Sequence, residues 1–281
     1  MSSSGASRAL ITGAASGLGK SLALRFAVEG WRVAICDLDE ERVRQTADEI
    51  DCAGGIGMSF RADVTSEQDL LQVAESISEN WGGLDVLVCN AGIATAGRID
   101  ETSMEEWRRI FEVNFFGVLT TVRTMLPLVA RGGHLINVAS FAGIAAAPGL
   151  VAYNTTKAAV ISFSESLRAE LVDRDIGVSV TCPAFFKNRL METSGAAHDK
   201  TRAMVERFME RSKISADDVA EQMFRSVESR QFMLIAHADA RWYWRLKRYF
   251  PELYFRSLKR MARSTSRAGK NDHTRQSENV G

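Results

Sequence analysis

Short apolar runs alternate along the chain with segments in which apolar residues recur at helical spacing, from residue 8 to about residue 236. Runs of this length are typical of buried strands. Strands that alternate with helices predict an α/β fold, in which helices cover both faces of a doubly wound parallel sheet. About seven strands are expected, over residues 9–11, 31–37, 56–61, 84–89, 134–140, 177–181 and 231–236.

The first predicted helix, over residues 20–27, follows a glycine-rich turn with the sequence Thr-Gly-Ala-Ala-Ser-Gly-Leu-Gly. Glycines let a backbone approach a phosphate without an intervening Cβ. The helix N-terminus adds free N–H groups and a partial positive charge. Because strand, turn and helix follow one another, Gly13, Gly17 and Gly19 are expected to hold a pyrophosphate. The alternative is an ordinary flexible turn.

A second helix, over residues 151–173, carries Tyr153 and Lys157 in its first two turns. Residues four apart share one face of a helix, so the phenol and the ammonium are expected to point into one cleft. A phenol beside a cation ionises more easily, which makes it a usable acid or base near neutral pH. Taken alone, such a pair is also common on solvated helices.

The glycine turn, the Tyr153–Lys157 pair and the order of the motifs between them resemble the short-chain dehydrogenase/reductase family. The resemblance covers about 190 residues. It implies a single Rossmann-type domain over residues 1–240 and hydride transfer between a nicotinamide cofactor and a substrate. It also implies a homodimer or homotetramer, in which the long helices of residues 104–130 and 151–173 pair between subunits.

The resemblance assigns four catalytic positions. Tyr153 would exchange a proton with an alcohol or a ketone, and Lys157 would lower the pKa of Tyr153 and bind the nicotinamide ribose. Ser140 would bind the substrate oxygen together with Tyr153 and stabilise charge developing there. Asn114 would help a water chain to carry the proton from Lys157 to solvent. Taken singly, Ser140 could be a turn residue and Asn114 a satisfied core amide.

The cofactor contacts implied by the resemblance run along the ends of successive strands. In the motif that follows the fourth strand, Cys89 replaces the first of two asparagines that are usual in the family. After the sixth strand, Ala184 replaces a glycine, and Asn188 stands where a threonine that binds the carboxamide is usual. The expected cofactor-binding residues are Gly13, Ser16, Gly17, Leu18, Gly19, Asp37, Asp63, Val64, Asn90, Gly92, Tyr153, Lys157, Pro183, Phe186 and Asn188.

The acid at the end of the second strand, Asp37, bears on the choice of cofactor. In a dinucleotide fold, such a carboxylate accepts hydrogen bonds from the adenosine ribose and repels a 2′-phosphate. Neither Ser16 nor Leu38 is basic, whereas relatives that favour NADP often carry Arg or Lys nearby. NAD is therefore expected over NADP, although Asp37 could also be a solvated strand-end carboxylate.

Composition narrows the class of protein. The chain has 281 residues, 46% of them hydrophobic, so it can bury one large core. Its 35 basic and 35 acidic residues balance, so no nucleic-acid partner is expected. Neither its cysteines nor its histidines have metal-ligand spacing, and no metal is expected. The cysteines are interpreted as buried thiols of a cytoplasmic protein, since no signal pattern or membrane span is evident.

A segment over residues 185–212 corresponds to the variable substrate loop of the family. Its several Phe and Met side chains suit a pliable apolar pocket, so the expected substrate is an apolar secondary alcohol or ketone of steroid-like, cyclic or long-chain type. The alternative is that these residues only pack a lid helix.

The C-terminal region, residues 241–281, contains 11 Lys or Arg and 3 Asp or Glu. Residues 241–263 are expected to form a helical extension rich in basic and aromatic residues, interrupted at Pro251, and residues 264–281 a disordered tail. The extension is expected to close the active site or to pack on a neighbouring subunit. A weak contact with an anionic membrane surface is the alternative.

The leading hypothesis is an active NAD-dependent oxidoreductase. The alternative is a catalytically silent protein that binds the dinucleotide and acts in regulation or at a membrane surface. The presence of both Tyr153 and Lys157 favours the enzyme.

Overall fold

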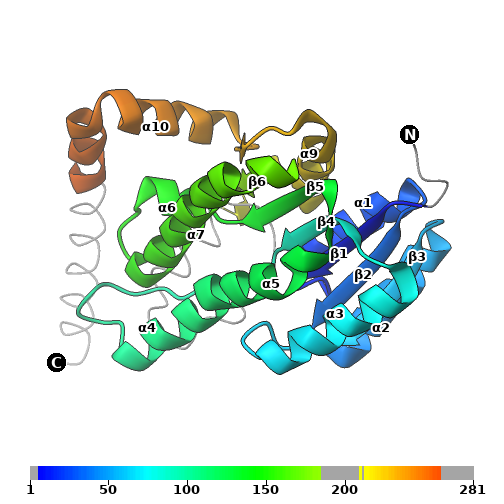
Figure 1. Cartoon of the computed structure of the whole chain (residues 1–281). Helices are drawn as coiled ribbons and strands as arrows, with labels where there is room; N and C mark the ends of the chain where they lie inside the picture. Colours follow the sequence, from blue (N-terminus) through cyan, green and yellow to red (C-terminus); the bar gives the residue numbers. More distant parts are fainter. Residues whose placement is uncertain (1–5, 185–208, 211, 261–281) are drawn as a thin grey trace.

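A parallel sheet of seven strands forms the centre of the computed structural model, which describes residues 6–184, 209–210 and 212–260 (Figure 1). Its order is β3-β2-β1-β4-β5-β6-β7, and every neighbouring pair is parallel. The strands are β1 (Arg8–Thr12), β2 (Arg32–Asp37), β3 (Ile56–Arg61), β4 (Leu84–Cys89), β5 (Val129–Val138), β6 (Gly177–Thr181) and β7 (Met233–Leu234).

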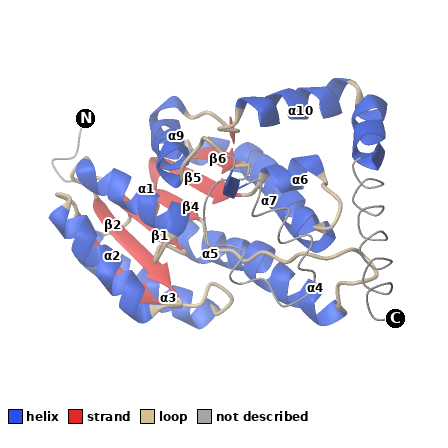
Figure 2. Cartoon of the chain, turned by 180° about the vertical axis from the view of Figure 1, so that it is seen from behind, coloured by secondary structure: helices blue, strands red, loops and turns tan. Residues whose placement is uncertain are grey.

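Helices cover both faces of the sheet, as the alternating pattern predicted (Figure 2). One core cluster joins the sheet to α1 (Gly17–Val28), α2 (Glu40–Cys52) and α9 (Ala216–Ser229). The other joins it to α3 (Glu67–Trp81), α5 (Gly117–Met125) and α7 (Val151–Glu170). Within β1, Ala9 and Ile11 belong to the first cluster and Leu10 to the second, because successive strand residues point to opposite faces.

The strand order reverses between β1 and β4, since β1 leads outward to β2 and β3 while β4 leads to β5, β6 and β7. At such a switch point, the connections after the two central strands diverge and leave a crevice at the carboxyl ends of the strands. The glycine turn follows β1 at this point, so the fold places it at the crevice.

The expected long helix over about residues 104–130 is helical without a break from residue 104 to residue 128, but it contains a π-helical turn and ends two residues early. The chain forms α4 (Met104–Phe111), a π-helical turn η1 (Glu112–Phe116), α5, and a short 3₁₀ turn η2 (Leu126–Leu128). Val129 is already extended and pairs with Leu84, so β5 begins five residues before the expected start at residue 134. Pro127 lies in η2 and lacks the N–H that a continuing helix needs.

Two further differences concern β7 and the cysteines. Strand β7 has two residues, where six were expected. Cys36, Cys89 and Cys182 are buried free thiols, but Cys52 is exposed, because it ends the solvated helix α2 instead of lying in a strand.

After β7 the chain forms α10 (Ala238–Tyr249), which packs against α6 (Phe141–Ala145). Phe250 departs from helical geometry, and residues 251–260 are helical again, with Pro251 at the start. This agrees with the interruption expected at Pro251. The expected tail, residues 264–281, lies outside the described residues. Among those described, no helix is both long enough and apolar enough to cross a membrane.

Candidate active site

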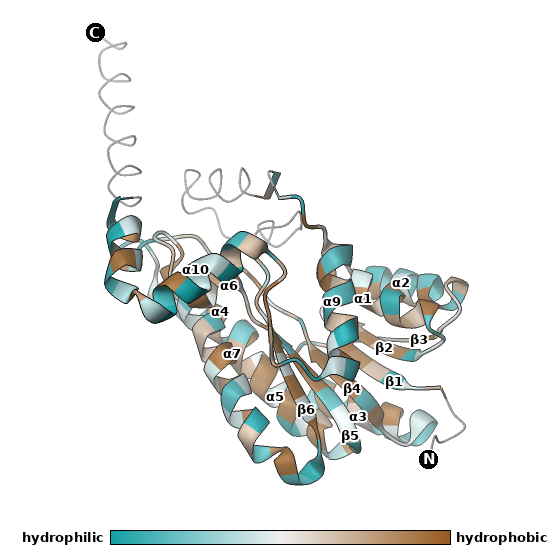
Figure 3. Ribbon diagram, turned by 90° about the horizontal axis from the view of Figure 1, so that it is seen from above, coloured by the Kyte–Doolittle hydropathy of each residue, from teal (hydrophilic) through white to brown (hydrophobic). Residues whose placement is uncertain are grey.

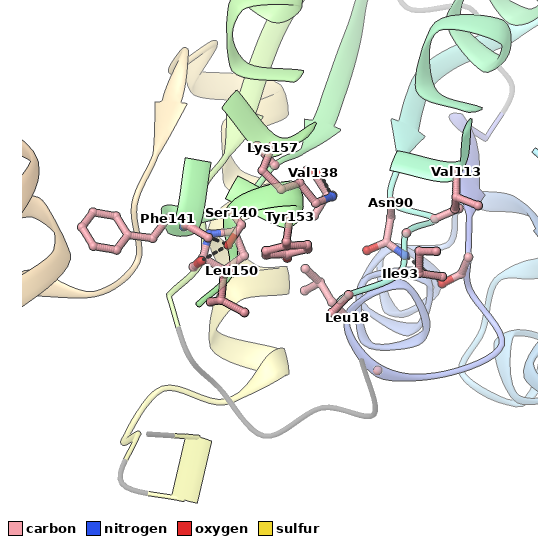
Figure 4. Close-up of a pocket in the computed structure, with 18 of the residues that line it drawn as sticks. Leu18, Asn90, Ile93, Val113, Val138, Ser140, Phe141, Leu150, Tyr153 and Lys157 are labelled. Carbon is pink, nitrogen blue, oxygen red and sulfur yellow. Dashed lines mark hydrogen bonds between the residues drawn. The ribbon is translucent and has the colours of Figure 1, made fainter. Parts of the chain in front are cut away.

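A cavity of about 920 Å³ opens along the carboxyl ends of the strands. It is at the upper end of the range of about 300–1,000 Å³ typical of ligand sites. Most of the residues expected to bind cofactor or substrate line it, and Figure 4 shows Ser140, Tyr153 and Lys157 on one side and Asn90 on the other. Those that line it are Gly13, Ser16, Gly17, Leu18, Asp37, Asp63, Val64, Asn90, Gly92, Ser140, Tyr153, Lys157 and Pro183.

Four expected site residues do not line the cavity within the described part of the chain. Gly19 and Asn114 lie behind it and support residues that do line it. Phe186 and Asn188 lie outside the described residues, as does the expected substrate loop up to residue 208. Met209, the first described residue after that gap, is buried and lines the cavity.

The glycine turn is held in place by Asn90, which follows β4. The Asn90 side-chain Nδ2 donates to the carbonyl oxygens of Thr12 at 2.9 Å and of Gly13 at 2.8 Å. Gly13 has a φ of +65°, and a Cβ there would lie 2.6 Å from the Ala91 Cα. Helix α1 begins at Gly17, so its N-terminal N–H groups face the same space. The turn therefore has the shape and polarity of a phosphate cradle.

The carboxylate of Asp37 faces the cavity at the end of β2. Its Oδ2 accepts a hydrogen bond from the Ala15 N–H at 3.0 Å, which fixes its orientation beside the glycine turn. Asp39 also lines the cavity and forms an ion pair with Arg42 at 3.2 Å. Arg42 was not expected at the site. Its position on the first turn of α2, just after Asp37, is the signal that could have found it.

The next strand end carries Asp63 and Val64, both of which line the cavity. Asp63 Oδ1 accepts hydrogen bonds from the Thr65 N–H at 2.9 Å and the Thr65 hydroxyl at 2.8 Å. The side chain of Val64 is largely buried and packs close to Gly117 at the start of α5. These contacts make a rigid apolar wall with a polar edge, which suits a planar ring.

Tyr153 and Ser140 meet at the opposite end of the cavity. Tyr153 comes from the first turn of α7 and is buried, and its phenol lies near enough to the Ser140 hydroxyl for that group to lower the phenol pKa. Ser140 lies two residues beyond β5 and caps α6, where its Oγ accepts from the Ala142 N–H at 3.1 Å. A cap fixes the hydroxyl, so it can orient a substrate oxygen against the phenol.

Lys157 lies one turn beyond Tyr153 and is buried. Its Nζ donates to the Val138 carbonyl oxygen at 3.0 Å and lies 5.9 Å from the centre of the Tyr153 ring. Burial lowers the pKa of Lys157 to about 8, and the nearby Cys182 thiol raises it by less. Close to neutral pH, this ammonium therefore loses its proton far more easily than an exposed lysine does.

The expectation that Lys157 lowers the pKa of Tyr153 is not met in the ligand-free chain. Burial raises the pKa of Tyr153 to about 12, and the opposing influence is the hydrogen bond from Ser140. Burial destabilises the phenolate more than the Lys157 ammonium stabilises it, because burial also disfavours the charged form of Lys157. At neutral pH the phenol is therefore protonated.

Asn114 lies in the π-helical turn η1 and is fully buried. Its Oδ1 accepts from the Ile93 N–H at 2.8 Å, and its Nδ2 donates to the Ile93 carbonyl oxygen at 2.9 Å and the Thr156 hydroxyl at 3.2 Å. It therefore ties the loop after β4 to the helix that carries Lys157. Turns of π-helix are frequent at functional sites. The apolar sequence around Asn114 gave no sign of one.

Side chains of the C-terminal extension close the outer end of the cavity. Tyr243, Tyr254, Ser257 and Leu258 line it. Tyr254 is almost fully buried, and its hydroxyl donates to the Ala145 carbonyl oxygen at 2.6 Å. The contact agrees with the expectation that the extension closes the active site. The aromatic cluster in the sequence pointed to this region, but not to which of its rings, Tyr243 and Tyr254, line the cavity.

The arrangement fits a dinucleotide. The glycine turn offers N–H groups at one place, Asp37 offers an acceptor at the adjacent strand end, and the Tyr153 phenol lies at the far end of the same cavity. Within the described residues, no group of His, Cys, Asp or Glu side chains is arranged to hold a metal ion.

Comparison with known proteins gives a consistent result. The family model for short chain dehydrogenase matches residues 7–199. A "probable oxidoreductase EphD" from Mycobacterium tuberculosis is 36% identical over 232 residues, which are 79% of this chain but only 39% of that protein. The chain thus spans about two fifths of the length of this relative. A "putative oxidoreductase SadH" from the same species is 33% identical over 72% of this chain and 75% of its own length.

A third relative and two solved structures extend the comparison. The 2,5-dichloro-2,5-cyclohexadiene-1,4-diol dehydrogenase LinX of Sphingobium indicum is 37% identical over 62% of this chain and 71% of its own. A short chain dehydrogenase/reductase from Burkholderia phymatum in complex with NAD superposes with a TM-score of 0.83, at 29% identity over 90% of this chain and 96% of its own. A short-chain dehydrogenase from Streptomyces avermitilis gives a TM-score of 0.77 at 26% identity, over 94% of this chain and 99% of its own.

Proposed function

The chain belongs to the short-chain dehydrogenase family, and on that premise we propose that it is an NAD-dependent oxidoreductase interconverting a secondary alcohol and a ketone on a largely apolar substrate. The observation that carries this proposal is that the Tyr153 phenol and the Ser140 hydroxyl line the same cavity as the glycine turn. A proton donor and a dinucleotide cradle in one cavity are the two parts that such a reaction needs.

When bound, the nicotinamide supplies the acceptor or donor of the hydride. In reduction, the Tyr153 phenol gives its proton to the substrate carbonyl oxygen while the carbonyl carbon gains the hydride. In oxidation, the Tyr153 phenolate takes the hydroxyl proton as the hydride leaves the carbinol carbon. Ser140 holds the same oxygen and stabilises the charge that develops on it.

Lys157 would carry the proton onward in this scheme. Its lowered pKa, about 8, lets it give up and regain a proton near neutral pH. An added Cβ on Gly92 would lie 3.4 Å from Lys157 Nζ and 3.1 Å from Asn114 Oδ1, so both groups face the space beside Gly92. This geometry supports a water-mediated exit past Asn114.

The preference for NAD rests on the charges at the end of β2. Asp37 and Asp39 both line the cavity there, and among the described residues Arg42, which lines it beside them, is already paired with Asp39. A 2′-phosphate at this place would meet an uncompensated carboxylate. We therefore expect kcat/KM to be higher with NAD than with NADP.

The apolar substrate follows from the outer half of the cavity. Phe141, Leu150, Met209, Tyr243 and Tyr254 line it, and side chains of this kind bury apolar rings. The name of the relative LinX refers to a cyclic diol, which is compatible with a cyclic apolar alcohol here.

Assembly and location complete the proposal. Met104 in α4 and Phe116 in η1 are exposed apolar side chains on the helices expected to pair between subunits, which supports a homodimer or homotetramer. Three buried free thiols support a reducing, cytoplasmic environment. Light scattering coupled to gel filtration tests the assembly, and a monomeric mass would contradict it.

The decisive test of the activity is NADH formation by the purified protein against a panel of secondary alcohols, which ranges from cyclic and steroid-like compounds to small sugars. We expect turnover of apolar alcohols and little turnover of sugars. Tight NAD binding without turnover of any alcohol, and without reduction of any matching ketone by NADH, would favour the catalytically silent alternative.

A further inference from the structure

The outward face of α10 combines arginines with aromatic rings. Three arginines of this helix lie at helical spacing: Arg245 follows Arg241 by four residues, and Arg248 follows Arg245 by three. They therefore share one side of the helix. Trp242 and Tyr249, seven apart, lie along the flank of that stripe, with 57% and 68% of their surfaces exposed.

The aromatic character continues past the end of the helix, where Phe250 is 63% exposed. Figure 3 shows hydrophilic and hydrophobic residues side by side in α10 and in the helical segment after it. The arginine–aromatic face, as we name it, consists of Arg241, Trp242, Arg245, Arg248, Tyr249 and Phe250.

The charge of this region is one-sided. Residues 241–260 contain seven Lys or Arg and a single acid, Glu252. None of the ion pairs among the described residues involves Arg245 or Arg248. The two guanidinium groups are therefore available to bind anions outside the protein.

We propose that the arginine–aromatic face docks the protein on the headgroup region of an anionic lipid bilayer. Arginine pairs with phosphate oxygens through two parallel hydrogen bonds, and a cluster of basic side chains is drawn to the negative surface of such a bilayer. Tryptophan and tyrosine prefer the zone between headgroups and acyl chains, where a ring is buried and its polar edge stays hydrated.

A second copy of this chain fits the face less well. Symmetric pairing through one patch sets like residues against one another, so the arginines of two copies would meet without acids to neutralise them. An anionic lipid surface instead matches both the charge and the exposed rings, which is why we commit to it as the occupant.

The docked helix also borders the cavity. Tyr243, on the flank of α10, and Tyr254 line the outer end of the cavity. If the protein is the oxidoreductase proposed above, an apolar substrate dissolved in the bilayer would reach the site without crossing water. The docking itself does not depend on that activity.

Co-sedimentation of the full-length protein with lipid vesicles tests the proposal. We expect the protein to pellet with vesicles that contain phosphatidylserine and not with pure phosphatidylcholine, and to be released as salt is raised. The double variant Arg245→Glu, Arg248→Glu should bind phosphatidylserine vesicles at least about tenfold more weakly. Trp242→Ser should weaken binding and leave its salt dependence in place, since it removes only the apolar part.

The matched control is the double variant Arg44→Glu, Arg61→Glu, which makes the same change in net charge at the far edge of the sheet. Both side chains are exposed, with their nearest acids at 3.9 and 3.8 Å. This control should bind vesicles within about twofold of the wild type. Unchanged thermal unfolding of both variants shows that the effects do not come from loss of the fold.

Four results of the vesicle and mass measurements would overturn the proposal, and a competition experiment adds a fifth. The wild type could fail to pellet with phosphatidylserine vesicles, or could pellet equally with phosphatidylcholine vesicles. The Arg245, Arg248 variant could bind vesicles as strongly as the wild type, or could have a lower oligomeric mass. The last would make the face a subunit interface. Release by soluble glycerophosphoserine would likewise replace the bilayer with a simple anion site.

Discussion

Burial sets the protonation of the two reactive side chains in the cavity. The same desolvation that raises the pKa of Tyr153 to about 12 lowers the pKa of Lys157 to about 8. Both groups are thereby pushed toward their neutral forms. A phenol that stays protonated is ready to donate in ketone reduction, whereas oxidation needs further stabilisation of the phenolate once cofactor and substrate are bound.

The substitution Lys157→Met is expected to stabilise the ligand-free protein at pH 7, on the order of 1–3 kcal/mol, because it removes the cost of a buried ammonium. The folded pKa, about 8, lies below the ordinary 10.5, so the unfolded chain binds more protons between these values. Wild-type stability therefore rises with pH across that window. The advantage of the variant should be full below pH 8 and vanish above about pH 10.5.

Urea unfolding of both proteins at pH 7 and near pH 10 measures this effect. The variant should also lose turnover. A variant less stable than the wild type at pH 7 would show that the hydrogen bond from Lys157 to the Val138 carbonyl outweighs the desolvation.

The substitution Tyr153→Phe should lower kcat by about a hundredfold to ten-thousandfold, since it removes the proton donor and keeps the ring. The dissociation constant for NAD, measured by calorimetry, should change far less, because the glycine turn and Asp37 are untouched. Tyr249→Phe, an exposed tyrosine outside the cavity, is the control and should retain full turnover. Wild-type turnover by the Tyr153 variant would remove the assigned role.

At the scale of elements, the site depends on connections between strand ends more than on any one motif. Asn90, after β4, holds the turn after β1, and Asn114, in η1, holds the loop after β4 to α7. The Asn90 side chain donates twice, whereas that of Asn114 both donates and accepts, and each joins segments far apart in sequence. The relative position of the glycine turn and the Tyr153 phenol therefore depends on two amides, a half-buried one at Asn90 and a buried one at Asn114.

The substitution Asn90→Ala should destabilise the protein by about 1–3 kcal/mol, because it leaves the carbonyl oxygens of Thr12 and Gly13 without their donor. It should also weaken NAD binding by at least about tenfold, because the turn is no longer fixed. Thermal unfolding and calorimetry measure the two effects. Asn80→Ala, which removes two exposed hydrogen bonds to the Ser76 carbonyl and hydroxyl within α3, is the control and should do neither. Equal losses in both variants would contradict the role of Asn90.

The sequence predicted the strand ends closely where polar residues mark them. β2 and β4 end at Asp37 and Cys89, as the apolar runs indicated. Residues 131–133, Arg-Gly-Gly, have the composition of a turn and are irregular within β5, since Gly132 has a φ of +82° and the pairing with β4 jumps from Val129 with Leu84 to His134 with Val86. The start of β5 at Val129 was missed because its pairing with Leu84 is a long-range contact that has no local signal.

The candidate site shows the same difference between features with a local sequence signal and features that depend on long-range contacts. Glycine spacing, Asp37, Ser140 and the Tyr153–Lys157 pair could be recognised because each has a fixed distance to its neighbours in sequence. The direction of the Tyr153 pKa shift could not be predicted from the sequence, since it depends on how much water the fold excludes. The burial of Tyr254 in the cavity wall could not be predicted either, because it depends on packing against α6.

At the scale of the whole molecule, the excess of positive charge lies in a different part of the chain from the candidate catalytic residues. The region from residue 241 onward has a net charge of +8, and the rest of the chain balances it, because the total is zero. The extension nevertheless reaches the chemical site, since it closes the outer end of the cavity. It therefore forms part of the cavity wall as well as part of the surface.

Removal of residues 241–281 should leave the dissociation constant for NAD unchanged and raise KM for apolar alcohols by at least about tenfold. The reason is that Tyr243 and Tyr254 line the substrate end of the cavity, far from the glycine turn. Steady-state kinetics and calorimetry on the shortened protein test this. An unchanged KM would mean that the extension is no part of the pocket, and weakened NAD binding would point to general damage.

Lys247 and Tyr254 donate to adjacent carbonyl oxygens, those of Ile144 and Ala145, at the end of the short helix whose first residue follows Ser140. The described end of the extension is therefore bonded to the helix that seats the Ser140 hydroxyl. A displacement of Lys247 or Tyr254 would pull on that helix and so shift the hydroxyl itself, which ties the geometry of the Ser140 cap to the docking of a segment about a hundred residues further along the chain.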